Sequence, residues 1–177
     1  MRQIKKSTMS RKLAYRNLPQ LFLRARENLL CHFRPIITHF GLTEQQWRVL
    51  RAVSEMEELE PREICVICQI LSPSLTGVLS RMEDMDLLTR TRVQEDQRRI
   101  IVRLTSKGEK LVAQLGPLII EQYRIIEHAF GPELLKDVYE IMDKFIAVDS
   151  GTIPRIDLPD RDRADTAFSV GVEENEV

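Results

Sequence analysis

Two neighbouring stretches of the chain combine side chains that could bind a polyanion. The first, residues 72–76 (Ser-Pro-Ser-Leu-Thr), carries short hydroxyl side chains that allow a close backbone approach and can hydrogen bond base edges or phosphates. The second holds five arginines within fourteen residues: Arg90, Arg92, Arg98, Arg99 and Arg103. Guanidinium groups bind phosphates and favour the negative potential of a narrow minor groove. Together these stretches predict a surface for duplex DNA.

The reach of each side chain suggests its role on such a surface. Ser72 is predicted to cap a helix that begins with Pro73. Arg81 is long enough to reach a phosphate or a guanine from the same helix. An acid at Asp96 would repel DNA, so we assign Asp96 to orienting Arg98 for insertion into the minor groove. The predicted DNA-binding residues are Ser72, Ser74, Thr76, Arg81, Arg90, Arg92, Asp96, Arg98 and Arg99.

Helices must position these residues, and apolar periodicity with capping signals predicts where they lie. Apolar residues recur at helical spacing over residues 17–40, where Pro35 should kink or divide the helix and Gly41 should end it. A second helix opens at Thr43, which forms a reciprocal cap with Gln46. Its buried stripe is predicted to be Trp47, Leu50 and Val53.

The middle of the chain is predicted to be a helix-turn-helix followed by a β-hairpin. A short helix begins at Pro61, with Ile64, Ile67 and Cys68 toward the core, and the helix from Ser72 follows after a tight turn. Residues 88–93 and 99–104 then have strand character. Ile100, Val102 and Leu104 alternate with Ile101 and Arg103, which predicts a strand with one buried face. A hairpin in this position is a wing.

The remainder of the chain predicts two further helices and two polar ends. Thr105 caps a helix over residues 106–129 that should bend near Gly116-Pro117, and a last helix follows Gly131. Residues 1–16 are basic and are expected to form a flexible arm. Residues 149–177 sum to −5 in a chain of net charge −1, and are expected to be a disordered acidic tail. The predicted fold class is mainly α with a small β-hairpin wing.

Several motifs are similar to those of the MarR family of winged-helix transcriptional regulators. The winged-helix motifs are Ser72-Pro73-Ser74-Leu75-Thr76, Asp96-Gln97-Arg98-Arg99 and Leu104-Thr105-Ser106-Lys107-Gly108. Three others resemble the subgroup that regulates homoprotocatechuate (aromatic acid) degradation operons: Ala25-Arg26-Glu27, Phe33-Arg34-Pro35 and Gly41-Leu42-Thr43-Glu44-Gln45-Gln46-Trp47-Arg48. The resemblance covers residues 17–146, and the basic arm and acidic tail depart from it.

This resemblance implies a homodimer that straddles a pseudo-palindromic operator and is released from it by a small aromatic acid. It assigns residues 17–148 to one domain, with dimerisation helices at 17–40 and 106–147 and a DNA-binding lobe at 42–105. Helices of this family wall a cavity on which four candidate ligand residues lie: Arg26, Arg34, Trp47 and Arg48. Arginine can hold a carboxylate bidentately, and an aromatic face stacks on a ring.

Other functions are open to the same sequence. A redox-sensing repressor of this type could use Cys31, near His32 and Arg34, whereas Cys65 and Cys68 have the spacing of buried hydrophobes. Zinc binding by Cys65-x-x-Cys68 lacks a second ligand pair. An interaction module that ignores DNA is a further alternative. We predict no catalytic residue, cofactor or metal, and no apolar run long enough to span a membrane, which favours the cytoplasm.

Overall fold

The computed structural model describes residues 15–94 and 96–158 of the 177-residue chain, and its first helix is capped as predicted. The α1 helix (Leu18–His39) begins after Asn17, whose side chain accepts a hydrogen bond from the Gln20 N–H at 3.0 Å. It runs through Pro35 as one helix, so division at Pro35, one of the two predicted outcomes, does not occur. A proline removes one amide donor, which this long helix tolerates. Gly41, with φ of 71°, follows the end of the helix.

The α2 helix (Glu44–Met56) supplies much of the core of the predicted DNA-binding lobe. Its reciprocal cap between Thr43 and Gln46 is confirmed, and Leu50 and Val53 are fully buried. Two residues further on, Glu58–Leu59 form a short strand, β1, where the sequence predicts only an acidic turn. This strand was not predicted because two residues carry no alternation signal. It exists through its pairing with β3.

The α3 helix (Pro61–Cys68) and the α4 helix (Ser72–Asp84) are bent by 108° from one another, which is the geometry of a helix-turn-helix. Leu71 occupies the N-cap of α4, so the prediction that Ser72 caps this helix is wrong; Ser72 is its first helical residue. Ile67 is 47% exposed, contrary to prediction. In this two-turn helix only the narrow stripe of Ile64 and Cys68 is buried.

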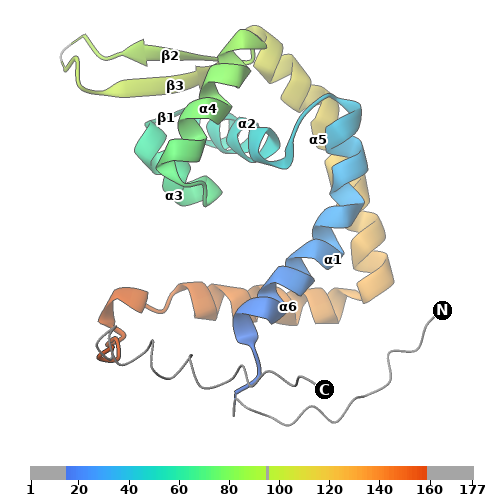
Figure 1. Ribbon diagram of the computed structural model, residues 1–177. Helices are drawn as coiled ribbons and strands as arrows, with labels where there is room; N and C mark the ends of the chain where they lie inside the picture. Colours follow the sequence, from blue (N-terminus) through green and yellow to red (C-terminus); the bar gives the residue numbers. More distant parts are fainter. Residues whose placement is uncertain (1–14, 95, 159–177) are drawn as a thin grey trace, which may run out of the picture. The chain divides into compact units, whose positions relative to one another are not determined.

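The sheet has the strand order β1-β3-β2, with all pairs antiparallel. The β2 strand (Leu88–Arg92) and the β3 strand (Ile100–Leu104) form the predicted hairpin, which projects beyond α3 and α4 in Figure 1. Ile101 and Val102 are both buried, so the prediction that only one face of this strand is covered is wrong. The reason is that β3 is central in the sheet and contacts α2, α3 and α5.

The α5 helix (Ser106–Phe130) lies beside α1 and joins this helix to the winged lobe (Figure 1). Thr105 caps it as predicted, and it continues through Gly116-Pro117 as one helix. Its contact with α1 includes the rings of Phe33 and Tyr123, whose centroids are 4.6 Å apart. At its start, the Thr105 N–H donates to the Leu87 carbonyl at 3.1 Å, which fixes the helix to the corner between α4 and β2.

Residues from Pro132 onward form a separate unit. It contains the α6 helix (Pro132–Ile146) and a short 3-10 turn, η1 (Ser150–Thr152). The apolar side chains of α6 are exposed in the single chain, among them Leu134, Val138, Tyr139, Ile141 and Phe145. Residues 1–14 and 159–177, which hold most of the predicted arm and tail, lie outside the described residues, so both remain predictions.

The predicted fold class, mainly helical with a small β-hairpin wing, is confirmed. Among the described residues, no single helix is long and apolar enough to cross a membrane. The α3 and α4 helices reach that length and apolar content only when they are counted together, and they are sharply bent where they meet.

Candidate functional site

The α4 helix presents a polar face opposite a fully buried one. Leu75, Val78, Leu79 and Met82 pack into the core, and this packing leaves Ser72, Ser74, Thr76 and Arg81 exposed. Apart from a long bond of 3.4 Å from the Thr76 hydroxyl to the Ser72 carbonyl, no hydrogen bond to these four side chains is found within the described ranges. Short hydroxyl groups and one arginine on an exposed helix are suited to reading the edges of bases in a major groove.

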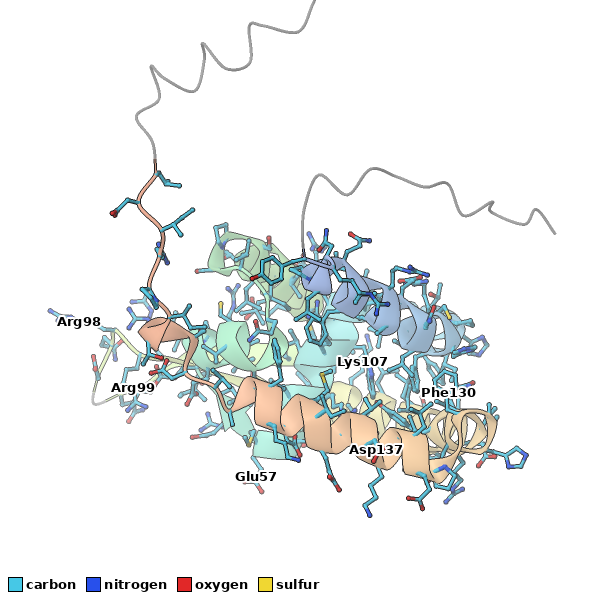
Figure 2. All side chains as sticks on the ribbon, turned by 90° about the horizontal axis from the view of Figure 1, so that it is seen from below. Glu57, Arg98, Arg99, Lys107, Phe130 and Asp137 are labelled. Carbon is cyan, nitrogen blue, oxygen red and sulfur yellow. The ribbon has the colours of Figure 1, made fainter. Side chains whose placement is uncertain are left out.

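The wing tip is shaped by Asp96, in a different way from the one predicted. Its carboxylate accepts a hydrogen bond from the backbone N–H of Arg98 at 3.0 Å, and its carbonyl accepts from the Arg99 N–H at 2.9 Å. Asp96 therefore orients Arg98 through the backbone of the turn, and no bond from its carboxylate to the Arg98 guanidinium is present. Figure 2 shows Arg98 extending from the outer end of the hairpin, with Arg99 beside it.

Three wing arginines are held by glutamates from outside the hairpin. The Arg90 Nε donates to Glu83 of α4 at 2.8 Å, and the Arg99 Nε donates to Glu60, before α3, at 2.7 Å. Arg103 pairs with Glu58 on β1. Hydrogen bonding to Arg90 lowers the pKa of Glu83, and hydrogen bonding to Glu60 raises the pKa of Arg99. These pairs fix the hairpin against the helix-turn-helix.

The remaining arginines of this surface are available to a ligand. Within residues 15–94 and 96–158, neither Arg92 nor Arg98 takes part in an ion pair, and the same holds for Arg62 and Arg81. Arg62 was not predicted; it lines a groove of about 580 Å³ between α3, α4 and the hairpin, together with Ser72, Thr76 and Arg90. Arg62 could have been predicted from the sequence, because it directly follows Pro61 at the start of a helix that lies beside the wing.

A second site is a cavity of about 270 Å³ between α2 and α5. Trp47, Arg51 and Ser54 line it from α2, where their spacing puts them on one face, and Tyr123 lines it from α5. The other walls are largely apolar, with Val112, Ile119 and Ile120. The Arg51 Nε donates to Glu55 at 2.7 Å, and this bond, with a smaller contribution from Tyr123, raises the pKa of Arg51.

Of the four predicted ligand residues, Trp47 alone is among those that line this cavity. Arg34 makes a bidentate pair with Glu27, at 2.9 and 3.0 Å, and also donates to Glu44 at 2.7 Å. Arg26 donates to Glu44 at 3.1 Å. Arg51, Ser54 and Tyr123 were not predicted. Arg51 and Ser54 follow Trp47 at intervals of four and three residues, and this helical spacing could have indicated both.

Arg48 faces the helix-turn-helix. Its guanidinium donates to the carbonyl of Cys68, the last residue of α3, and the Cys68 thiol donates back to the Arg48 carbonyl at 3.4 Å. Burial raises the pKa of the Cys68 thiol, which disfavours the reactive thiolate. Cys31 is exposed and Cys65 is half-buried, and no group of metal-ligating side chains suited to a metal ion exists in the part of the chain that the structure describes.

The fold and these two sites define a winged helix-turn-helix protein with a separate cavity beside its DNA-facing lobe. The family model described as MarR family matches residues 40–99. The HTH-type transcriptional regulator FarR of Neisseria gonorrhoeae is 42% identical over 119 residues, which are 66% of this chain and 82% of that protein. The homoprotocatechuate degradative operon repressor of Escherichia coli is 37% identical over 137 residues, 77% and 91% of the two chains.

Among solved structures, NadR in complex with 4-hydroxyphenylacetate matches with a TM-score of 0.68 at 33% identity, covering 78% of this chain and 98% of that one. The chain belongs to the MarR family of transcriptional regulators. The family and subgroup that the sequence motifs predicted are thereby confirmed, and the relatives named here are regulators of transcription.

Proposed function

We propose that this protein is a dimeric, cytoplasmic repressor of an operon for aromatic-acid degradation, and that a small aromatic carboxylate releases it from DNA. The observation that carries the proposal is the cavity in which Trp47, Arg51 and Tyr123 come together beside the DNA-binding lobe. The similarity to a homoprotocatechuate operon repressor and to NadR, which was solved with 4-hydroxyphenylacetate, supports a small aromatic carboxylate as the effector.

The DNA-binding part of the proposal rests on α4 and the wing. In a dimer, two α4 helices would enter successive major grooves, and each Arg98 would reach the flanking minor groove. The dimer itself is supported by apolar side chains that one chain leaves exposed on α5 (Leu118, Ile120 and Ile125) and, in the separate unit, on α6 (Leu134, Val138 and Ile141). Exposed apolar surface of this extent is typical of a protein interface.

The effector part rests on the size and chemistry of the cavity. An enclosed void of about 150 Å³ accommodates a benzene ring, and this cavity, which is open to solvent on one side, has about 270 Å³, enough for a ring with a short acid substituent. Trp47 would stack on the ring, and Tyr123 and Ser54 would hydrogen bond a ring hydroxyl. We assign the carboxylate to Arg51. Its partner Glu55 is 59% exposed at the side chain, so a carboxylate ligand can replace it at small cost.

Thermal melting with matched ligands and variants tests the proposal. We expect 4-hydroxyphenylacetate to raise the melting temperature, because a ligand at about 100 times its Kd stabilises the folded state by about 2.7 kcal/mol. The alcohol 4-hydroxyphenylethanol, which has the same ring but no carboxylate, should have little effect. Arg51→Met should abolish the shift, while Arg34→Met, which removes an arginine held by two glutamates, should keep most of it.

Two results would contradict these assignments. Equal shifts from the acid and the alcohol would show that no guanidinium recognises the carboxylate. A shift lost in Arg34→Met but kept in Arg51→Met would return the carboxylate to the arginine that the sequence first indicated. In either case, a gel shift against an operator duplex at two salt concentrations checks the DNA-binding part independently, because phosphate contacts make affinity fall steeply with salt.

A further inference from the structure

Two α2 side chains that are neighbours in sequence serve different parts of the molecule. Trp47 lines the cavity between α2 and α5, and so does Arg51. Arg48, which lies between them in sequence, does not line this cavity and instead donates to the Cys68 carbonyl at the end of α3. One rigid helix therefore carries both the cavity wall and the bond to the helix-turn-helix.

The bond between Arg48 and Cys68 joins two helices reciprocally. The guanidinium donates to the Cys68 carbonyl, and the Cys68 thiol donates to the Arg48 carbonyl at 3.4 Å. Cys68 is 4% exposed, and the Arg48 Nε is buried with no hydrogen-bond partner among the described residues. A buried guanidinium is costly to leave unpaired, so its bond to the Cys68 carbonyl matters for the fold.

A short turn connects Cys68 to α4, so the position of Cys68 affects the position of α4. The Ile70 N–H donates to the Cys65 carbonyl at 3.1 Å, and Ile70 itself is buried. Leu71 then caps α4, so only three residues separate Cys68 from the first residue of that helix. A displacement of the Cys68 carbonyl is therefore passed to the end of α4 that carries Ser72 and Ser74.

We propose that Arg48 is a positioning residue that couples occupation of the cavity to the placement of α4, an inference that rests on the proposed function. A ligand that wedges against Trp47 rotates α2. A rotation of about 10° moves an atom about 6 Å from the helix axis by about 1 Å. That distance exceeds the tolerance of a hydrogen bond, so the Cys68 carbonyl must either follow the guanidinium or lose it. When the carbonyl follows, the two α4 helices of a dimer lose the spacing that the operator requires. When the bond is absent, as in a variant without the guanidinium, the rotation of α2 is not passed to α4.

The test measures how strongly the effector weakens DNA binding in wild-type protein and in three variants. The duplex is one selected from a random library by the wild-type protein, and the effector is 4-hydroxyphenylacetate. The coupling ratio is the duplex Kd with saturating acid divided by the Kd without it. For wild type we expect about tenfold or more, within the usual range of about 5–150-fold. The Kd for the acid itself is measured by calorimetry.

Arg48→Met keeps the aliphatic stem but cannot donate, so its coupling ratio should fall below about threefold while its Kd for the acid changes less than about twofold. Arg48→Lys retains one donor and should recover an intermediate ratio. Cys68→Ala removes the thiol but keeps the carbonyl that accepts from Arg48, and therefore serves as the matched control. It should melt at a lower temperature and keep the wild-type ratio.

The outcomes separate this inference from the proposed function. If the duplex Kd of the wild-type protein is the same with and without the acid, both the proposed function and the role of Arg48 are wrong. A responsive wild type with an equally responsive Arg48→Met variant overturns only the role of Arg48. If Arg48→Met does not fold, the other two variants test the role of Arg48. An Arg48→Lys variant with the full wild-type coupling ratio would contradict that role. A Cys68→Ala variant that loses coupling would contradict it as well.

Discussion

Replacement of Gly108 by alanine should destabilise the protein through a single steric contact. Gly108 is buried in the first turn of α5, where the helix meets the corner between α4 and β2. A Cβ atom added there would lie 2.1 Å from the carbonyl oxygen of Leu87. Because the obstructing atom belongs to the backbone, no side-chain rotation relieves the clash, and the start of α5 must move by about 1 Å.

The size of the effect follows from what that movement disturbs. Overpacking of a close contact costs about 1–3 kcal/mol. The same movement weakens two hydrogen bonds, from the Thr105 N–H to Leu87 at 3.1 Å and from the Thr105 hydroxyl to Asp86 at 2.7 Å. Each contributes about 1 kcal/mol. Alanine recovers about 1 kcal/mol of helix propensity, so the net loss is about 2–4 kcal/mol.

The assay is thermal unfolding of Gly108→Ala beside Gly116→Ala at equal protein concentration, because the melting temperature of the proposed dimer would depend on concentration. We expect Gly108→Ala to lower the melting temperature by about 5–15 °C. At Gly116, on the same helix, an added Cβ meets nothing within 4 Å, so that variant should be neutral or more stable. Equal melting temperatures for the two variants would refute the close approach of α5 to Leu87.

Three further outcomes test the DNA-facing surface. Arg98→Ala should weaken operator binding by about 1–3 kcal/mol, and wild-type affinity in a fluorescence titration would argue against a groove contact. Arg62→Ala should reduce the salt dependence of binding by about one counterion per lost phosphate contact, whereas an unchanged slope would place Arg62 off the duplex. The pKa of Glu83 is lowered in the folded state, so its pair with Arg90 stabilises the protein above the ordinary glutamate pKa and is lost as the pH falls through the lowered value. In Glu83→Gln, the free energy of unfolding should therefore fall less between neutral and acid pH than in wild type, by less than about 1 kcal/mol. If urea titrations give the same fall for both proteins, the pair does not form.

The fold was predictable largely because its boundaries depend on local signals. Thr43 with Gln46, Thr105 and Gly41 each act within a few residues, and the structure has the predicted helix boundaries at all three. The two-residue strand β1 depends on a partner more than forty positions away, which no local pattern contains. The cap at Leu71 was missed because serine before proline is the stronger local signal, and the chain enters α4 one residue earlier.

The sites were less predictable than the fold because the identity of an arginine does not reveal its partner. Arg34 and Arg51 look equally suited to a carboxylate in the sequence. Their surroundings differ in the structure: Arg34 is bound by Glu27 and Glu44, whereas Arg51 lies at the cavity and its carboxylate partner is the exposed Glu55. The same holds for the wing, where Arg90 and Arg99 are tied by distant glutamates and Arg98 is not.

The glutamates that hold the wing also lower the net positive charge that the hairpin offers to DNA of any sequence. Residues 88–104 carry five arginines and two acids, and Glu58, Glu60 and Glu83 bring the formal charge of the hairpin and its glutamate partners to zero, which leaves Arg62 and Arg81 as the excess positive charge of this surface. Affinity for arbitrary sequence grows with uncompensated positive charge, so this balance shortens each visit to a non-operator site. Discrimination among the many competing sites of a genome then depends on the arginines that have no acidic partner among the described residues, such as Arg92 and Arg98.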